Sequence, residues 1–176
     1  MNHVLQVHNF LTDDECTQII DKYKSKTEDT EGYKHTGYQY CIMSCADEVD
    51  WLIKSKEPHA IDLYQKAYPE SKLTPHMWRV EEMVFKHWKP GKHFDKWHSE
   101  NWMQHPYRIF NFQIYLSDHN CGTEFYDKSV IKSEKGKMTM FPAYFTHTHR
   151  GQECPDKKDR YLLGGYFHFY NERLMW

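Results

Sequence analysis

The chain has 176 residues, a formal net charge of −2 at pH 7 and an isoelectric point near 6.7. This length suits one domain with a sizeable core and is short for two. The nearly neutral charge balance gives no overall attraction to nucleic acid or to an anionic membrane surface. No apolar run approaches the roughly 20 residues of a membrane span, and the first ten residues lack a basic stretch followed by an apolar one. We therefore expect a single domain over residues 1–176, soluble and cytoplasmic, without nucleic-acid or membrane partners.

The cysteines bear on the redox compartment of the protein, and the ring side chains bear on its core or pocket. Five cysteines are present, and because they are odd in number and form no CxxC pair, free thiols in a reducing compartment are favoured over a disulfide framework. The chain also contains 13 histidines, 13 tyrosines and 6 tryptophans. So many ring side chains can line a pocket or fill a core.

The first 25 residues predict a short strand, a cap and a helix. Thr12 or Asp13 can accept hydrogen bonds from the first-turn amides, and Glu15 stands where a capping box needs it. The apolar stripe of this helix consists of Ile19, Ile20 and Tyr23.

A polar segment and a second helix follow. Residues 25–39 are polar with glycines and predict a loop. Residues 47–70 predict a helical region that is interrupted near Pro58 and ends at Pro69, because proline lacks the amide hydrogen that a helix interior requires.

After Thr74 the pattern changes to short runs of β-branched and aromatic residues separated by proline and glycine. The expected strands are "HMWRVEEMVFKHW", "YRIFNFQIYLSD", "TEFY", "SVIK", "GKMTMFP" and "RYLLGGYFHFY". Repeated strands without intervening helices favour a barrel or a double-sheet jelly roll over a parallel α/β fold. The predicted class is α+β, mainly β, with N-terminal helices packed outside.

Two histidine-containing pairs suggest a metal site. On a strand, residues i and i+2 face the same way, so His98 and Glu100 would project together, and so would His147 and His149. A single histidine on a half-buried strand is more often a structural residue than a ligand. One partner from each pair, however, completes the set of two imidazoles and one carboxylate that is typical of non-haem Fe(II) oxygenases.

Four segments together resemble a known family. In order and spacing, "HWKPGKHFDKWHSEN", "YRIFNFQIYLSDHNCGTEFY", "GKMTMFPAYFTHTHRG" and "RYLLGGYFHF" resemble the core of 2-oxoglutarate and Fe(II)-dependent oxygenases. The similarity is greatest to the prolyl-4-hydroxylase-like branch, including its small phage and bacterial members. It implies a double-stranded β-helix core, jelly-roll or cupin-like, over about residues 79–170. For a phage-encoded chain the compartment would be the host cytoplasm.

The resemblance assigns ligands position by position. The turn at Pro90 and Gly91 precedes the family's His-x-Asp, which falls on His98 and Glu100, with glutamate in place of the usual aspartate. A rival His-x-Asp lies upstream at His93 and Asp95, closer to the glycine than the family pattern expects.

The distal ligand has two candidates. The histidine before "RG" in small phage-like members favours His149, whereas the proline-to-histidine spacing of the broader family favours His147. We take His149 as the ligand and keep His147 as the alternative. The histidine that does not bind the metal would support the site or touch substrate.

The cosubstrate pocket is also implied by the resemblance. A cation opening the last core strand binds the far carboxylate of 2-oxoglutarate in the family, and Arg160 stands at that position, with Tyr115 matching a tyrosine that helps. A guanidinium suits a carboxylate well. The implied cofactors are Fe(II), 2-oxoglutarate and O2, with ascorbate as a further candidate.

The expected activity is hydroxylation of an unactivated C–H bond, coupled to conversion of 2-oxoglutarate to succinate and CO2. Closeness to prolyl hydroxylases makes a prolyl residue in a peptide or protein the leading substrate, and a free amino acid or other small molecule the alternative. Two other hypotheses stay open: a non-catalytic metal- or ligand-binding β-barrel, and zinc hydrolysis on a cupin-like barrel, which has no need for Arg160.

Overall fold

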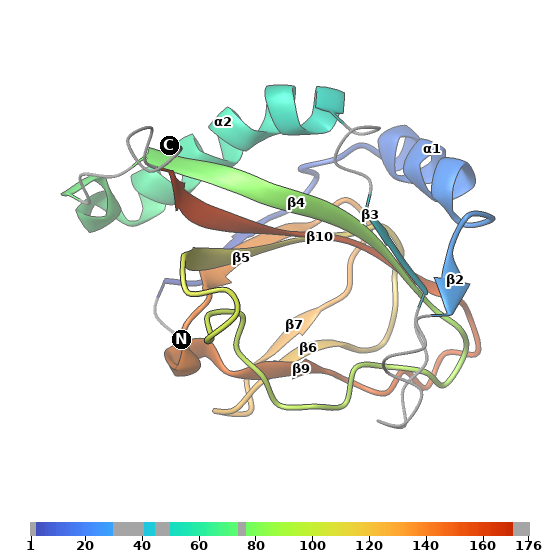
Figure 1. Cartoon of the computed structure of the whole chain (residues 1–176). Helices are drawn as coiled ribbons and strands as arrows, with labels where there is room; N and C mark the ends of the chain where they lie inside the picture. Colours follow the sequence, from blue (N-terminus) through green and yellow to red (C-terminus); the bar gives the residue numbers. More distant parts are fainter. Residues whose placement is uncertain (1–2, 30–40, 45–49, 74–76, 171–176) are drawn as a thin grey trace.

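The computed structural model describes residues 3–29, 41–44, 50–73 and 77–170. Figure 1 shows a large sheet with the helices on one side and a smaller sheet opposite its other side. All strand pairs in both sheets are antiparallel. The mainly β class with helices packed outside is therefore confirmed.

The larger sheet has seven strands in the order β1 (Leu5–Val7), β8 (Met138–Pro142), β5 (Arg108–Tyr115), β10 (Arg160–Tyr170), β4 (Met77–Trp88), β3 (Cys41–Ser44) and β2 (Glu28–Asp29). The smaller sheet has the order β7 (Val130–Lys132), β6 (Gly122–Phe125) and β9 (His149–Gly151). The helical elements are α1 (Asp13–Tyr23), α2 (Asp50–Ala67) and two 3-10 turns, η2 (Pro69–Leu73) and η3 (Phe145–His147). Each of the six predicted C-terminal strands coincides with one of β4 to β8 or β10.

Helix α1 begins as predicted. Thr12 is the N-cap, its hydroxyl accepts from the amide of Glu15 at 3.2 Å, and the Glu15 carboxylate accepts from the amide of Thr12 at 2.8 Å. The capping box therefore satisfies two amides that the first turn leaves free. Ile19 and Tyr23 are buried against the large sheet, and Ile20 is partly buried beside them.

Helix α2 corrects the prediction of a break near Pro58. The helix runs without interruption from Asp50 to Ala67 with Pro58 inside it. Pro58 is on the exposed side, where water can bind the carbonyl that lacks its helical partner, whereas Ala60 and Tyr64 pack on the sheet. The predicted stop is confirmed, because Pro69 begins the 3-10 turn η2.

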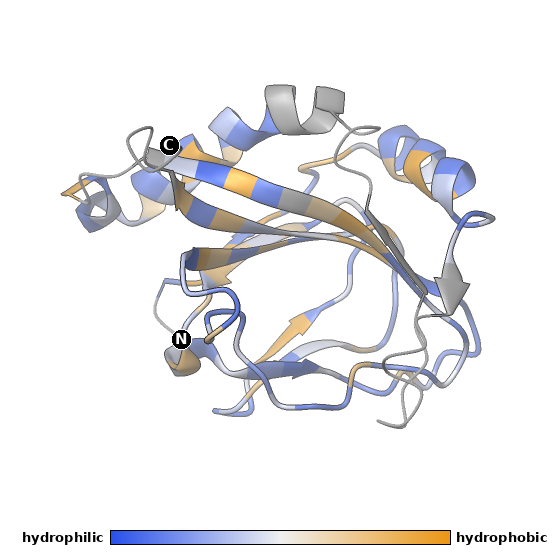
Figure 2. Ribbon diagram, viewed as in Figure 1, coloured by the Kyte–Doolittle hydropathy of each residue, from blue (hydrophilic) through white to orange (hydrophobic). Residues whose placement is uncertain are grey.

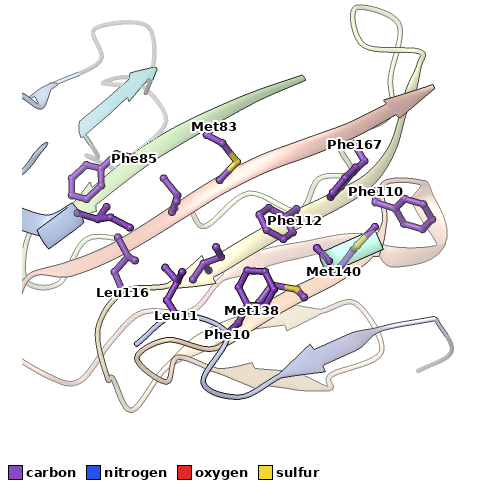
Figure 3. Packing of buried hydrophobic residues seen from close by; sticks show 14 of the residues in the cluster. Phe10, Leu11, Met83, Phe85, Phe110, Phe112, Leu116, Met138, Met140 and Phe167 are labelled. Atoms are coloured by element: carbon purple, nitrogen blue, oxygen red, sulfur yellow. The ribbon is translucent and has the colours of Figure 1, made fainter. Parts of the chain in front are cut away.

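Two apolar clusters lie on the two faces of the large sheet. The main core fills the space between this sheet and the helices, and Figure 3 shows Met83, Phe85, Phe112 and Phe167 within it. On β5, Phe110, Phe112 and Ile114 face this core, while Asn111, Gln113 and Tyr115 face the smaller sheet. Figure 2 shows that hydrophilic and hydrophobic residues also alternate along β4. The face between the sheets is therefore free to carry polar groups.

Three further expectations concern the predicted loop at residues 25–39, the stretch "WHSENW" and the absence of a membrane span. Within the predicted loop at residues 25–39, Glu28 and Asp29 form strand β2, and residues 30–40 lie outside the described residues. The stretch "WHSENW" at 97–102 is not a strand; His98 makes only an isolated bridge. None of the helices in the described parts of the chain is long and apolar enough to cross a membrane.

The expectation of free thiols is wrong for one pair of cysteines. A disulfide joins Cys121, before β6, to Cys154, after β9. The pairing of Thr123 with Gly151 brings these segments together, so that the two cysteine Cα atoms are 5.0 Å apart, within the usual range for a disulfide. Both cysteines are buried, and Cys16 is a free, buried thiol.

Removing this disulfide should destabilise the fold. It closes a sequence separation of 33 residues, for which loop-closure entropy predicts a loss of about 3 to 4 kcal/mol in the free energy of unfolding. Urea unfolding of the wild type and of a Cys121→Ser/Cys154→Ser variant would measure the difference. A thiol reductant should lower the wild-type midpoint and leave that of the variant unchanged. A wild-type midpoint that does not respond to the reductant would contradict the disulfide.

Candidate metal centre

Backbone hydrogen bonds bring the two halves of the site together. In the irregular segment between β4 and β5, the amide of His98 donates to the carbonyl of His149 at 3.0 Å, and the His149 amide donates back to His98 at 2.9 Å. The Glu100 amide donates to the carbonyl of Ala143, just after β8, at 3.0 Å. The main chain therefore positions His98 and Glu100 without a regular strand.

The ligand atoms of His98, Glu100 and His149 all lie within 4.8 Å of one another. Oε1 of Glu100 is 3.3 Å from Nε2 of His98 and 3.7 Å from Nε2 of His149. The Nδ1 atoms lie 2.9 Å and 3.0 Å from the carbonyl oxygens of Lys96 and His147, respectively. Because a carbonyl only accepts, each Nδ1 carries the hydrogen, and each neutral ring directs its Nε2 lone pair toward the carboxylate.

This arrangement fits a divalent transition-metal ion. Two imidazole lone pairs and a carboxylate oxygen that converge without a hydrogen between them repel one another unless a cation lies at their centre. Burial, together with the proximity of His98, lowers the pKa of His149 to about 3. Burial alone would raise the pKa of Glu100, but its interactions with the adjacent His98, His149 and Lys86 outweigh this effect and lower the pKa to about 2. Both residues therefore have the protonation states that ligation requires near neutral pH.

Three side chains that the sequence analysis missed lie close to the Glu100 carboxylate. The Asn111 amide donates to Oε1 at 3.0 Å and also lies 3.4 Å from Nε2 of His149. Burial and the nearby Glu100 carboxylate raise the pKa of the Tyr166 hydroxyl, and Nη1 of Arg108 is 4.0 Å from Oε2. The signal for Asn111 was its place as a polar residue among apolar ones on β5.

The alternative ligands lie elsewhere. His147 belongs to the turn η3 and not to strand β9, so the strand geometry expected for the two histidines is not present, and among the described residues His147 is in neither the ligand group nor the cavity lining. Its Nδ1 is 2.9 Å from the Thr146 hydroxyl, and its ring stacks on Phe141. Neither His93 nor Asp95 belongs to a group of described residues that could hold a metal ion.

A second group in the described parts of the chain has ligand atoms equally close together. It consists of His119, Cys154 and Asp156. The sulfur of Cys154 is in the disulfide, and Arg160 places a positive charge beside it. Neither feature favours a cation there.

The site opens into a cavity of about 510 Å³ between the two sheets, and Arg160 and Tyr115 line it. Arg160 is 7% exposed, its Nη1 donates to the carbonyl of Gln152 at 3.2 Å, and its guanidinium lies 4.7 Å above the ring of Trp88. Burial lowers its pKa to about 10, so it stays charged at neutral pH. Among the described residues, no carboxylate forms an ion pair with Arg160.

Tyr115 lies beside Arg160 in this cavity. Its hydroxyl is 2.8 Å from that of Thr123, and burial raises its pKa to about 12 although Thr123 and Arg160 act in the opposite direction. The structure therefore places all five predicted site residues around one cavity: His98, Glu100, His149, Arg160 and Tyr115.

No protein-family model matches the sequence, and no curated protein matches it. Solved structures do match in fold. A viral collagen prolyl hydroxylase from Paramecium bursaria Chlorella virus-1, in complex with 2-oxoglutarate, is 16% identical with a TM-score of 0.73, and the match covers 97% of each chain.

Two cellular proteins give similar matches. A prolyl-4-hydroxylase from Pseudomonas putida is 16% identical with a TM-score of 0.66, over 96% of this chain and 94% of the other. A prolyl hydroxylase from Trichoplax adhaerens, in complex with a peptide fragment of the hypoxia inducible factor oxygen degradation domain, is 15% identical with a TM-score of 0.68, over 98% and 86%. The resemblance found in the sequence is thus confirmed at the level of the fold, the double-stranded β-helix.

The choice between His149 and His147 as ligand leads to a direct test. His149→Ala should weaken Co²⁺ binding more than about 100-fold, because loss of a ligand exceeds the 10- to 100-fold cost typical of losing a supporting residue. His147→Ala is the matched control and should bind Co²⁺ as the wild type does. Isothermal titration of the metal-free proteins would measure both, and the reverse ranking would assign the ligand to His147.

Proposed function

We propose that this chain, which has the fold of prolyl hydroxylases, is an Fe(II)- and 2-oxoglutarate-dependent dioxygenase that hydroxylates an unactivated C–H bond. One observation carries the proposal. The convergent ligand set of His98, Glu100 and His149 shares a cavity with the buried guanidinium of Arg160, which has no carboxylate partner among the described residues.

The three side chains would hold iron on one face and leave other positions open for cosubstrate and O2. Bound Fe(II) with 2-oxoglutarate supplies the oxidising chemistry, in which 2-oxoglutarate becomes succinate and CO2 as one oxygen atom enters the substrate. The chain's part is to fix the ligands and exclude water. The Asn111 amide fixes Glu100, and the ring of Phe125 packs on that of His149.

The far carboxylate of 2-oxoglutarate would bind Arg160. A buried guanidinium without an anionic partner is costly, and a carboxylate with bidentate geometry would compensate its charge. The hydroxyls of Tyr115 and Thr123 lie on the same side of the cavity and can donate to the same group. Trp88 and Leu162 line the cavity nearby and limit the access of water.

For the substrate we propose a prolyl residue in a peptide or protein. Solved structures similar in fold to this chain include enzymes named as prolyl hydroxylases, one of them in complex with a peptide fragment. Trp102 lines the cavity and is half exposed. The amides of Glu100 and Asn101 donate to the carbonyl of Ala143, and exposed Phe145 follows Ala143 by two residues. Exposed apolar side chains at a cavity edge favour a polypeptide partner.

Anaerobic titration with Fe(II) and 2-oxoglutarate tests the oxygenase assignment. The wild type should develop the weak visible charge-transfer band of an iron-bound keto acid, and Glu100→Ala should lose it. Arg160→Ala should raise the 2-oxoglutarate concentration for half-saturation by about 10-fold or more, as expected for a lost charge-assisted hydrogen bond, and Arg160→Lys should recover part of this. Metal binding without any band would instead indicate a non-catalytic metal module.

A matched pair of surface variants tests the peptide substrate. Phe145 and Leu73 are 81% and 83% exposed, and Phe145 follows by two residues Ala143, whose carbonyl accepts from the amide of Glu100. With a proline-containing peptide, Phe145→Ala should raise KM about fivefold with little change in kcat, because one lost contact of about 1 kcal/mol affects binding alone. Leu73→Ala should change neither constant. Succinate release measures both, and equal values for the two variants would contradict a peptide contact at Phe145.

A further inference from the structure

A further cation, Lys86, lines the cavity in addition to Arg160, and its side chain is partly buried. Lys86 is on β4 opposite Leu162 of β10, and its side chain lies across the backbone of Gly164. A Cβ atom at position 164 would come within 3.3 Å of both Cε and Nζ of Lys86. Glycine at this position therefore leaves room for the ammonium group to lie against the sheet.

The direction of this side chain separates it from the proposed 2-oxoglutarate pocket. Arg160 begins β10, whereas Nζ of Lys86 lies over Gly164 and 6.0 Å from the ring of Tyr166, further along the same strand. Lys86 and Glu100 line the same cavity and their charges interact, so the ammonium group lies on the metal side of the cavity. Its position is next to the place where a substrate would react.

Two further cations that line the cavity, Arg108 and Arg150, have carboxylate partners. Nε of Arg108 is 2.7 Å from Glu81, and Nε of Arg150 is 2.8 Å from Glu124. Among the residues that the structure describes, Lys86 forms no hydrogen bond and no ion pair. Burial lowers its pKa, and although Glu100 attracts the ammonium group, that carboxylate is already engaged by the metal site. An anion from outside the chain would compensate the charge of Lys86.

We propose that Lys86 binds a carboxylate of the substrate to be hydroxylated, a role that rests on the proposed oxygenase function. The substrate then carries this carboxylate close to its reacting carbon. Two sources have this chemistry: the α-carboxylate of a C-terminal residue or free amino acid, and the side chain of an acidic residue next to the target. The enzyme would discriminate against the corresponding amides, because they leave the ammonium group unpaired.

Binding of small matched ligands tests this without requiring turnover. The anaerobic complex with Fe(II) and 2-oxoglutarate would be titrated with N-acetylproline and with N-acetylprolinamide, and then with N-acetyl-Asp-Pro-amide and N-acetyl-Asn-Pro-amide. Perturbation of the charge-transfer band reports binding. In at least one pair the acid should bind about 10-fold or more tightly than the amide. The preferred pair identifies the source of the carboxylate.

Two variants of Lys86 provide the controls. Lys86→Met keeps the length of the side chain but removes the charge, and should abolish the preference for the acid while leaving binding of the amide unchanged. Lys86→Arg should retain part of the preference. The 2-oxoglutarate concentration for half-saturation should stay that of the wild type in Lys86→Met, in contrast to Arg160→Ala.

The outcomes separate the two proposals. No charge-transfer band in the wild type would overturn the oxygenase function itself. A normal band with no preference for either acid would overturn only the role of Lys86. A Lys86→Met variant that loses affinity for 2-oxoglutarate would also overturn it, since Lys86 would then belong to the cosubstrate pocket.

Discussion

The reciprocal backbone hydrogen bonds between His98 and His149 are the contact on which the site depends. They join the irregular segment after β4 to the edge strand β9 of the smaller sheet. Because these bonds use main-chain atoms, the two imidazoles approach each other whatever other side chains surround them. The segment bearing His98 thus connects the large sheet to the small one at the point where the metal would bind.

The two faces of the large sheet differ in composition and in role. One face packs aromatic and aliphatic residues against the helices, which supplies most of the buried apolar surface. The other face carries only a small apolar cluster and can therefore hold Asn111, Lys86 and Arg160 around a cavity. The alternation of side chains along each strand makes this division possible, because neighbouring residues point to opposite faces.

Glutamate in place of the family's aspartate is accommodated by specific contacts. The longer side chain has one more rotatable bond, which would loosen its position in an open site. Here the Asn111 amide donates to the carboxylate of Glu100, and Arg108 lies near its second oxygen. Such contacts orient a metal ligand. The substitution is therefore compatible with the proposed iron site.

Much of the fold followed from local sequence. The capping box at Thr12, the stop at Pro69 and the six C-terminal strands depend on neighbours a few residues away, so they could be predicted from spacing and residue type. The pairs His98/Glu100 and His147/His149 could be found from spacing for the same reason, and the family resemblance favoured His149 and added Arg160 and Tyr115.

What only the tertiary structure decided involves residues that are distant in sequence. The position of His147 in a turn, the disulfide between Cys121 and Cys154, and the continuous helix through Pro58 all result from packing between separate elements. The roles of Asn111 and Lys86 likewise depend on which residues lie opposite them across strands. Sequence by itself determined the strands, caps and candidate ligands. Strand register decided which of these side chains meet, because register results from long-range pairing and not from local preference.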